Sequence, residues 1–478
     1  MMYPRLKIAW DLLADDGLIA VSIDDKEVFQ LGKLLDEIFG TSNKLACAPW
    51  LSEASGGKEK TGLRTGHEYL LIYYKRTSEN VSQEERSTGE LNLKDKYGQY
   101  RKGRELMKWG GTSLREDRPN QFYHLKTPDN IEVLPYRNDG KEGHWRWGKN
   151  NESIIKALED PDFFHWELSS YDNGVEVNGQ YERWVPYEKI RDQKKSTGWS
   201  SWLDKYGTNA DGTREIKDLF GKKIFDTPKP TQLIKWLINL HADENAIVLD
   251  FFSGSCSTAH ATMQLNMEDD GGRQFIMVQL NEFCDENSEA FKAGYKNICE
   301  IGRKRIDLAG DKILKENKDK DGIEKLDIGF KMFRVGDTSI NWLHQDLKGG
   351  DLFDHYDKNA SDKDKLDFTP DFNDLDVVYE IMLRQTDIPL SSRVVKLSDI
   401  GGRTYIFADS FVVCLEQNIT RELVNRLAAI EPLPVKFVFR DSAFDDDIAL
   451  KDETFRALSA LIERNSGEKK QTYTVEFI

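Results

Sequence analysis

The residues of this chain best suited to chemistry lie in one short segment, residues 247–260, which reads IVLDFFSGSCSTAH. The apolar start predicts a strand, which runs into a turn of small residues and then a helix. Asp250 stands at the carboxyl end of that strand, where α/β sheets bind ligands. A carboxylate there suits the cationic end of a ligand, such as an amino or sulfonium group. The small residues at positions 253–255 would let the ligand approach the backbone.

Other interpretations of this segment exist. It lacks the Lys-Ser/Thr of a phosphate-binding P-loop and the third glycine of the dinucleotide motif GxGxxG. A dinucleotide oxidoreductase is therefore disfavoured. A plain strand–turn–helix joint, in which small residues serve only packing, stays open as an alternative.

The elements that would position this segment follow an α/β pattern. Short apolar runs alternate with amphipathic stretches near both ends of residues 1–311, whereas residues from about Thr77 to Gly221 show no clear pattern. The Lys/Asp-rich stretch Lys312 to Lys325 predicts a linker. The main expected elements are a helix over Tyr3–Leu13, strands over Leu18–Ile23, Leu45–Trp50 and Tyr69–Lys75, a helix over Pro230–Leu240, a strand over Phe275–Leu280 and a helix over Ser288–Gly310.

Length and composition narrow the class of protein. A chain of 478 residues predicts two or three domains. It contains no run of about twenty apolar residues and no secretory leader pattern, so we expect a cytoplasmic protein that does not enter a membrane. Its five cysteines lack CxxC spacing. That pattern indicates reduced thiols and predicts no metal site.

Charge is distributed unevenly. The net charge of −16 argues against a protein that coats nucleic acid indiscriminately. Residues 91–150, however, hold thirteen Lys and Arg against eight Asp and Glu, whereas residues 309–478 hold twenty-four against thirty-three. The basic window could meet phosphates, or it could be an ordinary solvated face.

The segment DFFSGSCSTAHATMQLN resembles the S-adenosylmethionine loop of amino-methyltransferases, written DxFxGxG. FDTPKP upstream and FIMVQL and GYKNICEIGRKRI downstream stand in the same order as in that family. Further blocks along nearly the whole chain, such as MMYPRLKIAWDLL, HEYLLIYYK and FRDSAFDDD, resemble the modification subunits of type III restriction–modification systems. These are DNA adenine-N6 methyltransferases of β-class motif order.

The resemblance implies an architecture. We expect a class I methyltransferase-like, twisted and mostly parallel sheet with helices on both faces, an inserted target-recognition domain and a small C-terminal α/β domain. The implied boundaries are 1–76 for the first part of the methyltransferase domain, 77–220 for the DNA-reading domain, 221–311 for the cofactor-binding part and 326–478 for a dimerisation and partner domain.

The resemblance also implies a cofactor site. Lys229 would meet the methionine carboxylate, and Gln279 would meet the ribose hydroxyls, with Glu282 as its substitute. Cys256 departs from the pattern because it replaces the second glycine, and a positive φ there would be strained. The implied cofactor-binding residues are Asp250, Phe252, Gly254, Thr258, Thr227, Lys229, Pro230 and Gln279.

DNA contacts are expected in residues 77–220. Asn120 and Gln121 could read adenine edges, and Trp109, Trp145 and Trp147 could stack on bases or belong to the core. The cationic residues expected to bind DNA are Arg101, Lys102, Arg104, Lys108, Arg115 and Arg118.

The catalytic motif of the family, [DNS]PP[YFW], has no match, because none of the thirteen prolines are adjacent. The nearest imitations, Asp160-Pro161-Asp162-Phe163 and Ala48-Pro49-Trp50, stand in the wrong order, so we assign no catalytic residue. We expect an N-terminally truncated chain that lacks a central strand between the strand of Asp250 and that of Leu18–Ile23. Unless another polypeptide fills the slot, such a chain would be poorly stable and inactive.

Two functions therefore stand. The first is a site-specific methyltransferase that moves a methyl group from S-adenosylmethionine to a flipped adenine of double-stranded DNA. It would form a homodimer and bind a restriction helicase-nuclease subunit. The second is a non-catalytic DNA-binding or assembly remnant, or one half of a split gene.

Overall fold

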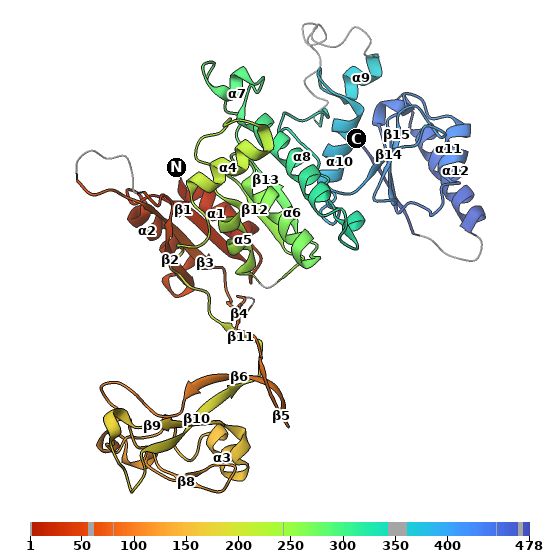
Figure 1. Cartoon of the computed structure of the whole chain (residues 1–478). Coiled ribbons are helices and arrows are strands. Elements are labelled where there is room, and N and C mark those ends of the chain that lie inside the picture. Colours follow the sequence, from red (N-terminus) through yellow and green to blue (C-terminus); the bar gives the residue numbers. More distant parts are fainter. Residues whose placement is uncertain are drawn as a thin grey trace. The chain divides into compact units, whose positions relative to one another are not determined.

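The computed structural model describes residues 2–55, 62–79, 81–241, 243–342, 361–445, 447–466 and 472–478. The chain forms two compact units, Met1–Ile328 and Gly329–Ile478 (Figure 1). Of the helices within these described ranges, none combines the length and apolarity needed to cross a bilayer.

A three-stranded antiparallel sheet forms one part of the first unit. Its strands are β1 (Leu18–Ile23), β2 (Lys44–Leu51) and β3 (His67–Tyr74), in the order β1-β3-β2. One face packs against α1 (Met2–Leu12) and α2 (Val28–Phe39), and the other packs against α5 (Thr231–Asn239). Helices therefore cover this sheet on both faces.

A two-stranded parallel sheet forms the second part. It pairs β12 (Ile247–Asp250) with β13 (Gln274–Met277). Helix α6 (Ser257–Asp269) packs against both strands and against α5 (Figure 1). Helix α8 (Ile298–Glu316) packs on α6, and α4 (Asn209–Phe220) packs on α8.

The structure differs from the expected single, mostly parallel sheet. Within these two sheets only β12 and β13 pair in parallel, and β3 pairs antiparallel with both of its neighbours. The physical reason lies in the connections, because parallel neighbours need a crossover of a dozen or more residues, usually a helix. No helix is described between β2 and β3, whereas α6 provides the crossover between β12 and β13.

The helix expected over Ser288–Gly310 is also different. It is interrupted into α7 (Glu289–Lys292) and α8, and the Asn297 side chain caps α8 by accepting a hydrogen bond from Glu300 N at 3.0 Å. Helix α8 continues to Glu316, into the expected linker, because Ile313 is buried and extends its apolar face.

Residues 88–193 form an insertion. The chain enters and leaves this insertion through a single pair of strands. Strands β4 (Glu84–Ser87) and β11 (Lys194–Thr197) pair antiparallel, with Ser87 opposite Lys194. The other elements of the insertion are β5 (Leu93–Asp95), β6 (Gly98–Glu105), β7 (Leu125–Lys126), β8 (Glu132–Val133), α3 (Glu152–Glu159), β9 (His165–Ser170) and β10 (Glu182–Ile190). Four of these strands form a sheet in the order β5-β6-β10-β9.

The second unit is a five-stranded sheet with an apolar cluster on each face. Its strands, in spatial order, are β14 (Val394–Lys396), β15 (Thr404–Phe407), β16 (Phe411–Cys414), β17 (Lys436–Phe439) and β18 (Thr474–Phe477). Its helices are α9 (Asp362–Asp367), α10 (Asp374–Leu383), α11 (Arg421–Leu427) and α12 (Ile448–Ser466).

Candidate cofactor and DNA-binding sites

The loop that follows β12 is held by its own polar groups. The Asp250 carboxylate accepts hydrogen bonds from the Thr258 hydroxyl at 2.6 Å and from Phe252 N at 3.1 Å. Gly254 N donates to the Gln279 side-chain oxygen at 2.8 Å. The loop therefore joins the ends of both parallel strands to the start of α6, and it brings together four of the expected cofactor residues. The Phe252 side chain, by contrast, is exposed.

Cys256 occupies the position where the methyltransferase pattern has a glycine. It adopts the left-handed conformation at φ 58° and ψ 40° and directly precedes the first residue of α6. L-residues other than Gly, Asn and Asp rarely adopt this conformation, which costs roughly 1–2 kcal/mol. Burial raises the pKa of the Cys256 thiol to about 11. Its sulfur faces Gly302 of α8, where an added Cβ would come within 2.6 Å of the sulfur, so only glycine fits there.

Arg305 supports this loop through buried hydrogen bonds. The sequence alone had not indicated it as a site residue. Its guanidinium is fully buried and donates to the hydroxyls of Ser255 at 2.9 Å and Ser257 at 2.7 Å. A second nitrogen donates to Glu215 of α4 at 3.0 Å. The other Glu215 oxygen accepts hydrogen bonds from the backbone and hydroxyl of Thr231, at the start of α5. The network thus ties the loop to both helices.

Burial sets the electrostatics of this network. It raises the pKa of the Glu215 carboxyl above its ordinary value, and it lowers the pKa of the Arg305 guanidinium. The hydrogen bonds from Thr231 and the charge of Arg305 both oppose the effect of burial on the Glu215 pKa, and the charge of Glu215 opposes the effect of burial on the Arg305 pKa. This ion pair was hard to predict from the sequence, because Arg305 and Glu215 are 90 positions apart and each lies in a helix with other charged residues.

Residues 225–230, the FDTPKP segment, lie against the same loop. An added Cβ on Gly254 would come within 3.3 Å of the Phe225 ring. Thr227 has a positive φ of 49°, and Pro230 directly precedes the first residue of α5. The structure therefore brings the two segments together, although they are more than twenty residues apart in the chain.

The Lys229 side chain interacts with residues outside the loop after β12. Its ammonium forms an ion pair with Glu68 of β3 and lies 4.8 Å from the centre of the Trp50 ring. The hydrogen bonds of Lys229 and of Asp250 thus go to different partners. Any carboxylate bound by Lys229 would have to compete with Glu68, which the sequence reasoning had not identified.

The cationic residues expected to meet DNA fall into two groups. Lys102 pairs with Glu167 at 2.8 Å, Arg104 with Glu188 at 3.4 Å and Arg115 with Glu142 at 2.9 Å. In contrast, no ion pair is found for Arg101, Lys108 or Arg118 among the described residues, and Arg118 is exposed. Arg101 lines a cavity of about 400 Å³ together with Lys102 and Glu167.

All three tryptophans considered for base stacking make contacts within the insertion itself. Trp145 is fully buried, and its indole nitrogen donates to Tyr123 O at 2.8 Å. Trp109 donates to Glu105 at 2.8 Å. Trp147 packs against the same cluster as Trp145.

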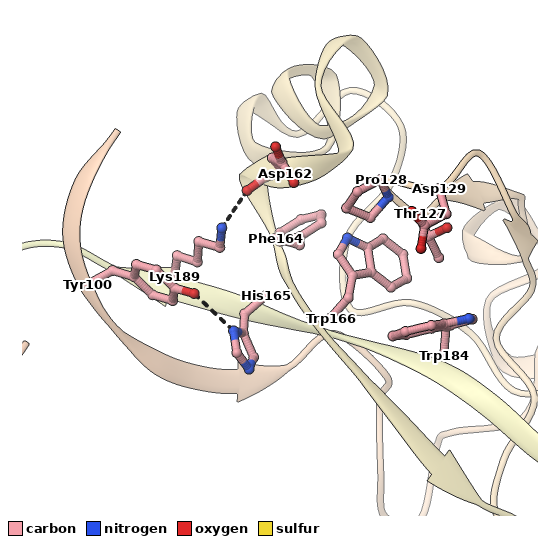
Figure 2. A pocket seen from close by; sticks show the side chains of 10 residues that line it. All are labelled: Tyr100, Thr127, Pro128, Asp129, Asp162, Phe164, His165, Trp166, Trp184 and Lys189. Carbon is pink, nitrogen blue, oxygen red and sulfur yellow. Dashed lines mark hydrogen bonds between the residues drawn. The ribbon is translucent and has the colours of Figure 1, made fainter. Parts of the chain in front are cut away.

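Other aromatic residues line a second cavity of about 270 Å³ in the insertion, shown in Figure 2. At one end Lys189 donates to the backbone oxygen of Asp162 at 2.6 Å, and Tyr100 is hydrogen-bonded to His165 at 3.1 Å. The aromatic walls are Phe164, Trp166 and Trp184, with Thr127, Pro128 and Asp129 beside them (Figure 2).

Comparison with known proteins defines the class. The family described as DNA methylase matches residues 1–292, which include both sheets and the loop after β12. The chain belongs to this DNA methylase family.

Individual relatives narrow the class further. The chain is 29% identical to the Type III restriction-modification enzyme EcoPI Mod subunit of Escherichia phage P1, over 98% of this chain and 72% of that protein. It is 34% identical to the Type II methyltransferase M.KpnI of Klebsiella pneumoniae, over 65% of this chain and 73% of that protein. It is 33% identical to the Type III restriction-modification enzyme StyLTI Mod subunit of Salmonella typhimurium, over 73% of this chain and 50% of that protein. The resemblance to type III modification subunits is thereby confirmed.

Proposed function

We propose that this chain is the cofactor-binding and DNA-reading part of a site-specific, adenine-N6 DNA methyltransferase of a type III restriction–modification system. One observation carries the proposal, namely that the FDTPKP segment packs against the loop after β12 at the carboxyl edge of a parallel sheet. That edge is where α/β proteins bind their ligands.

The residues of the loop fit S-adenosylmethionine. Gly254 has a positive φ of 49°, a conformation that glycine adopts without strain, and Gln279 follows the end of β13. Asp250 would orient the cationic end of the cofactor, and Phe252 would cover it. When bound, the cofactor supplies an electrophilic methyl group, and the residues of this chain hold it in place and exclude water.

The target adenine needs groups that this sequence does not contain. In amino-methyltransferases an acceptor side chain and a backbone carbonyl orient the amino group, and an aromatic ring stacks on the extruded base. No two prolines of this chain are adjacent, so the motif that provides these groups has no match. We therefore propose that the chain on its own binds cofactor and DNA without transferring the methyl group.

The DNA-reading part would be residues 77–220. Arg101, Lys108 and Arg118 are the best candidates for phosphate contacts, since no described carboxylate pairs with them. Residues 326–478 would serve homodimerisation and contact with a restriction subunit in the cytoplasm. A non-catalytic DNA-binding or assembly role is the second candidate, favoured by the missing motif.

Calorimetric titration of the purified full chain with S-adenosylmethionine tests the proposal. We expect binding at one site, weakened at least tenfold by Asp250→Asn. Asp243→Asn is a matched control, because Asp243 accepts a backbone hydrogen bond from Asn245 N near the other end of β12, as Asp250 does from Phe252 N. Absence of binding, or equal affinity of the Asp250→Asn variant, would overturn the proposal.

A further inference from the structure

The ion pair between Glu68 and Lys229 joins two distant segments of the first unit. Glu68 lies near the start of β3, beside the carboxyl end of β1, because the next residue, Tyr69, stands opposite Ile23. Lys229 belongs to the FDTPKP segment, which packs against the loop after β12. The pair therefore lies where the candidate cofactor site meets the carboxyl end of a neighbouring strand, the side of a sheet on which α/β proteins bind ligands.

Neighbouring side chains hold both charged groups in place. Lys229 Nζ lies 4.8 Å from the centre of the ring of Trp50, which is fully buried in β2 and donates its indole N–H to a backbone oxygen at 2.8 Å. Glu68 accepts hydrogen bonds from the Asn209 side chain at 3.4 Å and from the Ser22 hydroxyl at 3.5 Å. Since both long side chains are already ordered, a ligand that meets them loses less free energy to the ordering of side chains.

The backbone on either side of Lys229 is closely packed as well. An added Cβ on Gly212 of α4 would come within 2.1 Å of Pro228 O, and an added Cβ on Gly207 would come within 3.0 Å of the Pro230 ring. Glycine at these two positions lets α4 and the loop before it approach the FDTPKP segment. The position of the lysine backbone is thus fixed from both sides.

The pair is only partly buried, with side-chain exposures of 29% for Lys229 and 22% for Glu68. Within the described part of the chain, neither residue has a second ion-pair partner. A ligand with a negative charge alone would draw Lys229 away and leave the Glu68 carboxylate without a cation, which is unfavourable for a partly buried charge. A ligand with both charges on neighbouring atoms would leave neither residue unpaired.

The methionine end of S-adenosylmethionine is such a ligand, because at neutral pH it carries a carboxylate and an ammonium on the same carbon atom. We propose that Lys229 and Glu68 bind this end together. Lys229 donates to the carboxylate of the cofactor, and Glu68 accepts hydrogen bonds from its ammonium. Glu68 is then a cofactor-binding residue that selects for an α-amino acid end, and it does not compete with the ligand. This inference rests on the proposed function.

Calorimetric titration of the full chain with three thioether ligands tests the inference. S-adenosylhomocysteine carries both charges, its decarboxylated analogue keeps only the ammonium, and its deaminated analogue keeps only the carboxylate. Because a hydrogen bond between charged groups contributes roughly tenfold or more in affinity, Glu68→Gln should weaken the two ligands that have the ammonium by at least about that factor. It should not weaken the deaminated analogue. Lys229→Met should show the opposite selectivity, with loss only for the two ligands that have the carboxylate.

Asp15→Asn is a matched control and should change none of the three affinities. Asp15 forms an ion pair with Lys75, whose ammonium lies 4.6 Å from the centre of the Trp10 ring at the other end of β3. A folded Glu68→Gln variant that binds all three ligands equally weakly, or as well as the unmodified chain does, would overturn the inference. So would loss confined to the ligands with a carboxylate, because Glu68 would then only position Lys229.

The unmodified chain decides the matter should the Glu68 variant fail to fold. Removal of the amino group from S-adenosylhomocysteine should weaken its binding to this chain by roughly tenfold or more. Equal affinity for S-adenosylhomocysteine and its deaminated analogue refutes this inference and leaves the proposed function standing. Failure of the unmodified chain to bind S-adenosylmethionine or S-adenosylhomocysteine refutes the proposed function itself.

Discussion

The three-stranded sheet β1-β3-β2 and the two-stranded sheet β12–β13 share a layer of helices but differ in how they are covered. In the three-stranded sheet, Leu70 and Ile72 face α5 while Leu71 and Tyr73 face α1 and α2, and all four are at most 1% exposed. In the two-stranded sheet one face is open to solvent. The three-stranded sheet is therefore buried on both faces, whereas the β12–β13 sheet, which has one exposed face, carries the candidate site. Binding segments commonly belong to the less stable parts of a fold.

Replacement of Arg305 should have the largest effect on stability, because its hydrogen-bond network connects the loop after β12 to helices α4 and α5. Arg305→Met leaves Glu215 as a buried charge without its partner, which costs about 3–5 kcal/mol, and frees the loop after β12. We expect the unfolding free energy in urea to fall by that amount and cofactor affinity to fall with it. The double variant Arg305→Met with Glu215→Gln should recover much of the stability. A small effect of Arg305→Met would show that the sheets are not coupled here.

Substitution of one leucine in each sheet tests this difference in burial directly. Leu71→Ala in the covered sheet should cost about 2–5 kcal/mol, the usual range for a buried leucine. Leu249→Ala on the open face should change stability by less than about 0.5 kcal/mol, as an exposed position does. Urea unfolding of the free chain gives both values. Equal costs would mean that the β12–β13 face is covered in solution.

Cys256 offers a smaller test of the loop. At φ 58° glycine has no steric penalty, whereas alanine has the same steric penalty as cysteine. Both substitutions remove the sulfur, so their difference isolates the backbone strain. We expect Cys256→Gly to be more stable than Cys256→Ala by about 1–2 kcal/mol. If the two variants unfold together, the left-handed conformation is not maintained.

The smallest expected effect is on the rate at which the Cys256 thiol is alkylated. Burial raises the pKa of the Cys256 thiol to about 11, and only the thiolate reacts with alkylating agents. Its alkylation should therefore be slow at pH 7 and rise with pH, whereas the exposed Cys47 should react first. Mass spectrometry after iodoacetamide treatment gives both rates. Rapid reaction of Cys256 at pH 7 would mean that the loop opens.

Local pattern was enough to predict the loop itself. An apolar run that ends in an acid and then small residues has few structural solutions, and Asp250, Gly254 and Thr258 lie together as one hydrogen-bonded turn. The positive φ at Cys256 could be anticipated because the family has glycine there.

Pairings between distant residues could not be predicted. Arg305 and Glu215, or Lys229 and Glu68, meet only after the sheets and helices are assembled. The same holds for Lys102, Arg104 and Arg115, which form a basic cluster in the sequence but are neutralised by carboxylates of other elements. The direction of β3 was missed because a strand's own residues carry little information on its neighbours.

The β4–β11 ladder has one further consequence. Since Ser87 and Lys194 stand opposite each other, the insertion begins and ends at one point of the methylase core. Residues 88–193 could be exchanged for those of a relative without rerouting the chain elsewhere. Such an arrangement would let the proposed DNA-reading insertion be replaced as a unit while the proposed cofactor loop is kept.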